Sequence, residues 1–126
     1  MTERNQWTLD VPDAPYATPN SRQHAAKRGA MGAVWREATG WMAKAAKVPT
    51  GMDRIRVELV MLPKDGHHRD EDNLVSGVLK HMIDGLVDAG IVCDDTPDHV
   101  VAEMPRIHAP AQRTCHRWLL TITRLA

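Results

Sequence analysis

One stretch of the sequence, residues 67–95, constrains the fold most; it runs HHRDEDNLVSGVLKHMIDGLVDAGIVCDD. Its apolar residues recur at spacings of one, three and four, which predicts one amphipathic helix with a single apolar face. Asp72 is placed to cap the start of this helix, and Gly90 is placed to end it. The predicted apolar face comprises Leu74, Val75, Val78, Leu79, Met82, Ile83, Leu86 and Val87. Carboxylates therefore flank the helix at both ends.

The charge of this stretch needs an explanation, because it holds seven acidic and two basic residues and has a net charge of −5. Carboxylates brought together repel one another unless a proton or a cation lies between them. A small number of hard oxygen ligands suits Mg²⁺ or Mn²⁺. The other interpretation is that acids near a helix N-terminus answer its dipole while acids in a turn are solvated. The residue pattern alone leaves both interpretations open.

A longer pattern covers the same stretch. It comprises Arg69-Asp70-Glu71-Asp72-Asn73-Leu74, then Asp84-Gly85-Leu86 and Ala89-Gly90-Ile91 on the helix, then Asp94-Asp95. This order resembles the signature of the RusA family of Holliday junction resolvases, and the segments around Val100–Pro105 and Leu120–Thr123 resemble the two closing strands of that family. The resemblance implies a small α+β homodimer, with a mixed sheet packed against two main helices, that cuts four-way DNA junctions with Mg²⁺.

Carried over by motif position, the resemblance implies a metal-binding and catalytic triad of Asp70, Asp72 and Asp95, with Asp94 as a neighbouring ligand. Mn²⁺ is expected to substitute for Mg²⁺. DNA contacts are expected from Arg69 and, by a looser match in the segment before the first long helix, from Asn20 and Arg22.

The family pattern also has a catalytic lysine two residues after its Asn-Leu pair, where this chain has Ser76. Lys80 matches the lysine instead if four residues are inserted after Leu74. Four residues make about one helical turn, so an ordinary helix would keep Lys80 on nearly the same face. If a bulge early in the helix absorbs the insertion, Lys80 would regain the usual position. Both alternatives stay open.

The rest of the chain predicts one domain over residues 1–126. Strands are expected at Trp7–Val11, Arg54–Leu62, His99–Pro105 and Thr114–Leu125, with a loop at Arg106–Arg113. A long helix is expected at Arg22–Val48, with a break near Gly29 possible. Its expected inward face comprises Met31, Val34, Trp35, Ala38, Trp41, Met42 and Ala45. Tryptophans on such a stripe favour core or dimer contacts over stacking on bases.

Composition narrows the function classes. The formal net charge is zero, but residues 1–51 carry +3 and residues 96–126 carry +2. A basic rim around an acidic, metal-binding centre suits a phosphodiester substrate. Two isolated cysteines suit a reducing compartment such as the cytosol. The resemblance implies the cytoplasm of a bacterium or of a phage-infected host. No stretch is expected to span or enter a membrane.

These observations predict a metal-dependent endonuclease that resolves four-way junctions by paired, symmetric nicks, as the resemblance implies, and a phage gene is a common source of such a protein. A catalytically inactive junction-binding protein of the same fold is the alternative. A calcium-binding loop starting at Asp70 does not fit, because its twelfth position would be His81 and not a glutamate.

Overall fold

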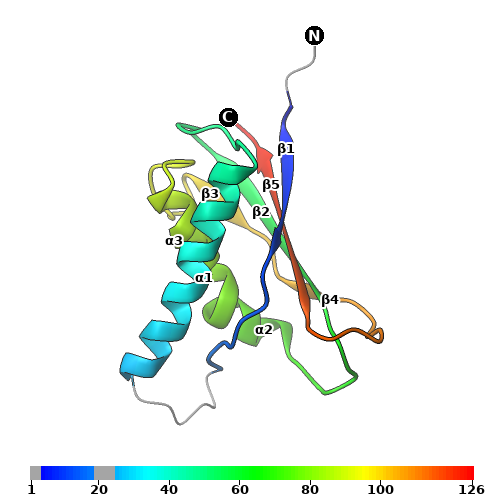
Figure 1. Cartoon of the computed structure of the whole chain (residues 1–126). Helices are drawn as coiled ribbons and strands as arrows, with labels where there is room; N and C mark the ends of the chain where they lie inside the picture. The colour runs from blue at the N-terminus through cyan, green and yellow to red at the C-terminus, as the bar shows by residue number, and fades with distance from the viewer. Residues whose placement is uncertain (1–3, 19–24) are drawn as a thin grey trace.

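The computed structural model describes residues 4–18 and 25–126, and its centre is a five-stranded mixed sheet (Figure 1). Strand β1 (Gln6–Val11) pairs antiparallel with β5 (Arg117–Arg124), and β5 pairs antiparallel with β2 (Ile55–Leu62). Strands β3 (Val100–Ala102) and β4 (Arg106–Ile107) both run parallel to β2 on its other edge. With helices against one face, the α+β class and the mixed sheet predicted from the sequence are confirmed.

Alternating apolar residues set which face of each strand is buried, as expected for a sheet covered on one side. On β2 every second residue is buried, namely Ile55, Val57, Leu59 and Met61, and the same holds for Trp118, Leu120 and Ile122 of β5. The sequence prediction was wrong on the third strand, which ends at Ala102 and not at Pro105. It was also wrong on the loop at 106–113, because this segment begins with β4.

Helix α1 (Ala25–Ala45) is continuous through Gly29 and lies across the sheet. It ends before the predicted Val48 because Lys47 adopts a left-handed φ of 57°, while the amides of Lys47 and Val48 donate to the carbonyls of Lys44 and Ala43. This is a Schellman end with a lysine where glycine is usual. Its predicted inward face was partly wrong, because Val34 and Trp41 are 52% and 65% exposed.

The second helical region has three parts, α2 (Glu71–Leu74), a π-helical segment η1 (Val75–Leu79) and α3 (Lys80–Asp88). The predicted apolar face is buried except for the exposed Val75 and the half-buried Val87. Gly90 ends the helix as predicted, with a φ of 76° and the amides of Gly90 and Ile91 bonded to Val87 and Leu86. None of the described helices is both long and apolar enough to cross a membrane.

Helices α1 and α3 approach closely because glycines line their contact. A Cβ added to Gly85 would lie 3.2 Å from the Gly40 nitrogen and under 3.0 Å from the Arg36 carbonyl oxygen. Gly32 and Gly40 of α1 therefore lie at the helix contact, whereas Gly29 meets no neighbour, and none of the three breaks the helix. The predicted helix face missed this contact because small residues such as Gly40 and Ala43 carry little apolar signal.

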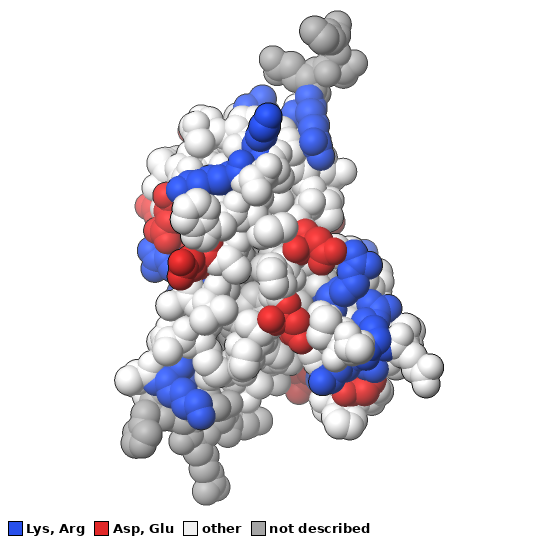
Figure 2. Space-filling view, viewed as in Figure 1, with Lys and Arg blue, Asp and Glu red and all other residues white. Residues whose placement is uncertain are grey.

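Charged side chains on the surface lie in mixed groups (Figure 2). Arg36 forms a two-pronged ion pair with Asp88 at 2.5 and 2.7 Å, and Arg117 pairs with Asp10 at 2.7 Å. Basic side chains gather on the lower right of the view, over the end of the sheet where the β4–β5 loop lies, with acidic side chains beside them. This face therefore shows basic side chains at one end of the sheet without a patch of a single sign.

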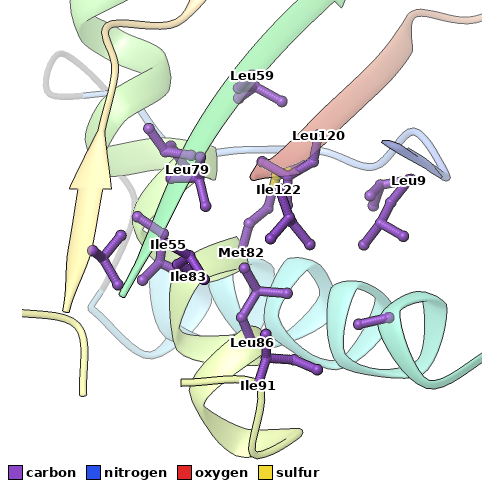
Figure 3. Close-up of a cluster of buried hydrophobic side chains, with 14 of the residues drawn as sticks. Leu9, Ile55, Leu59, Leu79, Met82, Ile83, Leu86, Ile91, Leu120 and Ile122 are labelled. Carbon is purple, nitrogen blue, oxygen red and sulfur yellow. The ribbon is translucent and has the colours of Figure 1, made fainter. Parts of the chain in front are cut away.

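The core lies between the helices and the sheet (Figure 3). Trp35 of α1 packs edge-on against Trp118 of β5, with ring centroids 5.0 Å apart, and both side chains are fully buried. Each indole N–H is bonded, Trp35 to the Pro15 carbonyl at 3.0 Å and Trp118 to Asp13 at 2.8 Å. These two bonds fix the loop that follows β1 over the end of the core.

Candidate active site

Asp70 and Asp72 lie in an open groove of about 890 Å³, here called the acidic groove. Its walls come from β2, from the start of α2 and from the segment that joins β3 to β4. The lining residues are Arg56, Glu58, Leu59, Val60, Asp70, Glu71, Asp72, Glu103, Met104, Pro105, Arg106, Ile107 and His108. The groove thus combines acidic side chains from all three segments with arginines from β2 and β4.

The acidic groove exists because the strand beside β2 is interrupted. Ala102 pairs with Val57 and Arg106 pairs with Val60, so the outer segment uses one residue more than β2 between the two pairs. The extra residue forms a bulge at Glu103–Pro105, as in a β-bulge, with Glu103 and Met104 exposed and Pro105 buried. Met104 stands 56% exposed on this bulge. The bulge therefore forms the wall that faces the two aspartates.

Asp70 takes the cap position before α2, so the prediction of Asp72 as the cap was wrong. Asp70 has extended backbone angles, and its carbonyl accepts from the Asn73 amide at 3.1 Å. Its side chain makes no capping bond, is 60% exposed and lies 3.1 Å from His68 Nε2. Asp72 is in the first turn of the helix and is exposed. Both carboxylates are therefore available to a ligand.

Asp95 lies in a separate, mostly apolar hollow of about 330 Å³ together with Lys80. The other lining residues are Val75, Ser76, Leu79, Ile83 and Ala102. The two depressions share a boundary along the chain. Ala102 lines this hollow, and the next residue, Glu103, lines the acidic groove. The structure thus places Asp70 and Asp72 together in the acidic groove, and Asp95 and Lys80 together in the neighbouring hollow.

The loop that carries Asp94 and Asp95 is anchored at both ends. Val92 forms a β-bridge with Met52, and the His99 carbonyl accepts from the Ile55 amide at 2.9 Å. Between the anchors, the Asp95 amide donates to the Asp94 carboxylate at 2.7 Å. Asp94 therefore supports the backbone of its neighbour, while the Asp95 side chain is left to the hollow.

The donor chemistry of the three predicted ligands fits Mg²⁺, since all are exposed carboxylates and, within the described segments, none forms an ion pair with lysine or arginine. Their arrangement is more open than a closed ligand shell. Over residues 4–18 and 25–126, no three His, Cys, Asp or Glu side chains converge closely enough to hold an ion. The Mg²⁺ or Mn²⁺ site stays a prediction.

Lys80 follows directly on the π-helical segment. The early part of this helix is therefore π-helical and not a regular α-helix, and the correspondence of Lys80 to the family's lysine stays a prediction. Gly77 lies at the centre of the segment, where a Cβ would meet the Ala17 carbonyl oxygen at under 3.0 Å. The loop after β1 thus packs directly on the π-helical turn beside Ser76. Such turns occur often at functional sites.

Arg69 is directed into its own loop. Its guanidinium donates to the backbone carbonyls of Asp65 and His67 at 3.1 and 3.0 Å and pairs with the Asp65 carboxylate. Its side chain is only 12% exposed, and its hydrogen bond holds the pKa of Asp65 below the usual value. Arg69 therefore braces the turn that presents Asp70, and its predicted DNA contact is untested. Asn20 and Arg22 lie outside the described residues.

Among the acidic, basic and histidine side chains of the acidic groove, the sequence prediction missed Glu58, Glu103, Arg106 and His108. Arg56 is a fifth, and its Nε lies 3.4 Å from Glu103. The only local signal was the outward register of Arg56 and Glu58 on β2. Arg106 and His108 reach the groove through parallel pairing with a strand far away in the sequence, which leaves no local pattern.

A scan against models of known protein families found no match, and a search of curated proteins found none either. The resemblance to the RusA family therefore rests on the motif residues themselves.

Proposed function

We propose that this protein is a Mg²⁺-dependent endodeoxyribonuclease of the RusA type that resolves four-way DNA junctions. The observation that carries the proposal is the acidic groove. Two carboxylates of the Arg-Asp-x-Asp-Asn-Leu motif lie in an open depression beside arginines from β2 and β4. Metal-dependent hydrolysis of DNA uses this combination. Carboxylates hold a metal at the phosphate to be cut, and cationic groups bind the phosphates on either side of it.

Asp70, Asp72 and Asp95 would hold the ion, with Asp94 supporting Asp95. When bound, Mg²⁺ would supply an activated water and neutralise charge on the leaving oxygen. Lys80 shares a hollow with Asp95 and would stabilise the charge that develops on the phosphate. Arg56 and Arg106 would hold phosphates on either side of the cut.

The substrate argues for a homodimer. A four-way junction has two-fold symmetry and is resolved by two symmetric nicks, so two copies of one site related by a two-fold axis fit it. The exposed thiols of Cys93 and Cys115 suit a reducing compartment, and the cytoplasm is the proposed location.

A cleavage assay on a synthetic four-way junction, with Mg²⁺ and with EDTA, tests the proposal. Asp70→Asn, Asp72→Asn and Asp95→Asn should each abolish nicking while the proteins stay folded, because asparagine has nearly the same shape but lacks the ligand charge. Asp98→Asn, in the same exposed loop as Asp95, is the matched control and should keep wild-type activity. Cleavage in EDTA, or near wild-type cleavage by an Asp95→Asn protein, would refute the assignment.

The alternative of a junction-binding protein without nuclease activity has one observation in its favour, the separation of Asp95 from the pair Asp70 and Asp72. The same experiment separates the two functions. An inactive binding protein would bind the junction in EDTA and would leave it intact at every Mg²⁺ or Mn²⁺ concentration.

A further inference from the structure

The outer face of α1 carries the largest exposed apolar side chain in the described part of the chain, Trp41. Its side chain is 65% exposed, and the only group seen stacked on it is Lys44, whose Nζ is 5.3 Å from the ring centroid. Val34, two turns earlier on the same face, is 52% exposed. Single exposed apolar residues are common on soluble proteins, but here a tryptophan and a valine lie exposed on one helix face, two turns apart.

The surroundings of Trp41 have room for a second aromatic ring. A hollow of about 360 Å³ lies beside the indole, and small residues, Ala33, Gly40 and Ala89, form part of its wall. Arg36 and Asp88 also line the hollow, and their ion pair neutralises both charges. The patch therefore offers both a protruding ring and a hollow of small residues, which is what a self-complementary two-fold contact needs.

Charges on the same face select the orientation of a partner helix. Glu37 and Lys44 lie on one flank of Trp41, about one turn before and one turn after it. In an antiparallel pair with its two-fold axis at Trp41, Glu37 of each copy faces Lys44 of the other. In a parallel pair, this flank of one copy would lie on the opposite side of the contact from the same flank of the other copy, so neither Glu37 nor Lys44 would meet its opposite charge. The helix is therefore complementary in charge to itself only when antiparallel.

We infer that the outer face of α1 is the contact surface of a homodimer, in which two α1 helices pack antiparallel with Trp41 at the two-fold axis and with two Glu37–Lys44 pairs beside it. The inference names the contact for the homodimer of the proposed function. It does not rest on the nuclease chemistry, because its test measures oligomeric state alone.

Sedimentation velocity over a range of protein concentrations tests the inference. The wild-type protein should form dimers, and Trp41→Ala should weaken dimerisation at least about 30-fold, the loss typical of a central interface tryptophan. Met104→Ala is the matched control, because Met104 is also an exposed apolar residue but lies on the β3–β4 bulge. It should leave the dimer unchanged. Circular dichroism should show native folding in both variants.

Charge reversal tests the orientation. Glu37→Lys alone and Lys44→Glu alone should each weaken the dimer roughly tenfold, since attraction becomes repulsion at two symmetric places. The double variant Glu37→Lys/Lys44→Glu should regain most of the affinity. A monomeric wild-type protein, a dimer insensitive to Trp41→Ala, or a double variant no better than the single ones would each overturn the inference. None of these results depends on whether the protein cuts DNA.

Discussion

Replacement of Gly85 by alanine should destabilise the protein, although alanine is the better helix former. On an open helix the change would add about 1 kcal/mol of stability. Here the new methyl group would lie under 3.0 Å from the Arg36 carbonyl oxygen and 3.2 Å from the Gly40 nitrogen. Both neighbours are backbone atoms, so no side-chain rotation relieves the clash, and α1 must move away from α3 by about 1 Å to restore a normal contact.

Overpacking of this kind costs about 1–3 kcal/mol, and the rigid backbone on both sides places this case at the upper end. Subtracting the gain of about 1 kcal/mol in helix propensity leaves a net loss of about 2 kcal/mol in the free energy of unfolding. This loss lowers the Tm by roughly 5–10 °C for a chain of this size. Urea unfolding measures the free energy directly. Gly29→Ala is the matched control, because a Cβ at Gly29 meets nothing within 4 Å, and it should add about 0.5–1 kcal/mol. A Gly85→Ala protein as stable as wild type would refute the close contact of α1 and α3.

Three further predictions concern the candidate site. Lys80→Ala should lower the single-turnover rate more than junction affinity, whereas Ser76→Ala should do little; equal rates for Lys80→Ala and wild type would remove Lys80 from the chemistry. Junction affinity should fall steeply with salt despite the zero net charge, with a log–log slope of about −5 if a dimer neutralises about six phosphates; a flat plot would argue against the basic rim. Burial holds the pKa of His116 below 6.5, and its Nδ1 accepts a hydrogen bond from the Lys64 amide at 3.0 Å. The stability linked to this neutral imidazole is therefore present above pH 6.5 and is lost as the pH falls below 6.5. The urea midpoint of the wild type should therefore drop more below pH 6.5 than that of His116→Gln, while His108→Gln, at an exposed position, should follow the wild type.

The sequence predicted the features that repeat locally. Alternation located β1, β2 and β5, and the glycine at position 90 marked a helix end, because each depends on a few neighbouring residues. Features that depend on distant contacts were missed. Strand β4 has two residues and shows no alternation, and the left-handed Lys47 carries no signal that a glycine would give.

In the candidate site, too, the sequence predicted the residues that depend on local spacing and missed those that depend on distant contacts. The spacing of Asp70 and Asp72 in the chain already indicates that they lie together, and the structure places both in the acidic groove. Arg106 enters the groove only because β4 pairs with β2, more than forty residues earlier in the chain. Whether Asp95 joins the two aspartates depends on the conformation of a loop, which neither periodicity nor spacing specifies.

The two anchors of that loop have a dynamic consequence. Since Val92 and His99 are both fixed to the sheet side of the molecule, any approach of Asp95 towards the acidic groove must arise within residues 93–98. Chain closure over so few residues is fast, on the order of tens of nanoseconds, and the entropy to be lost on ordering is small. If Asp70 and Asp72 hold an ion as proposed, Asp95 would reach it through rearrangement of this one short, exposed segment, while both helices and the sheet stay in place.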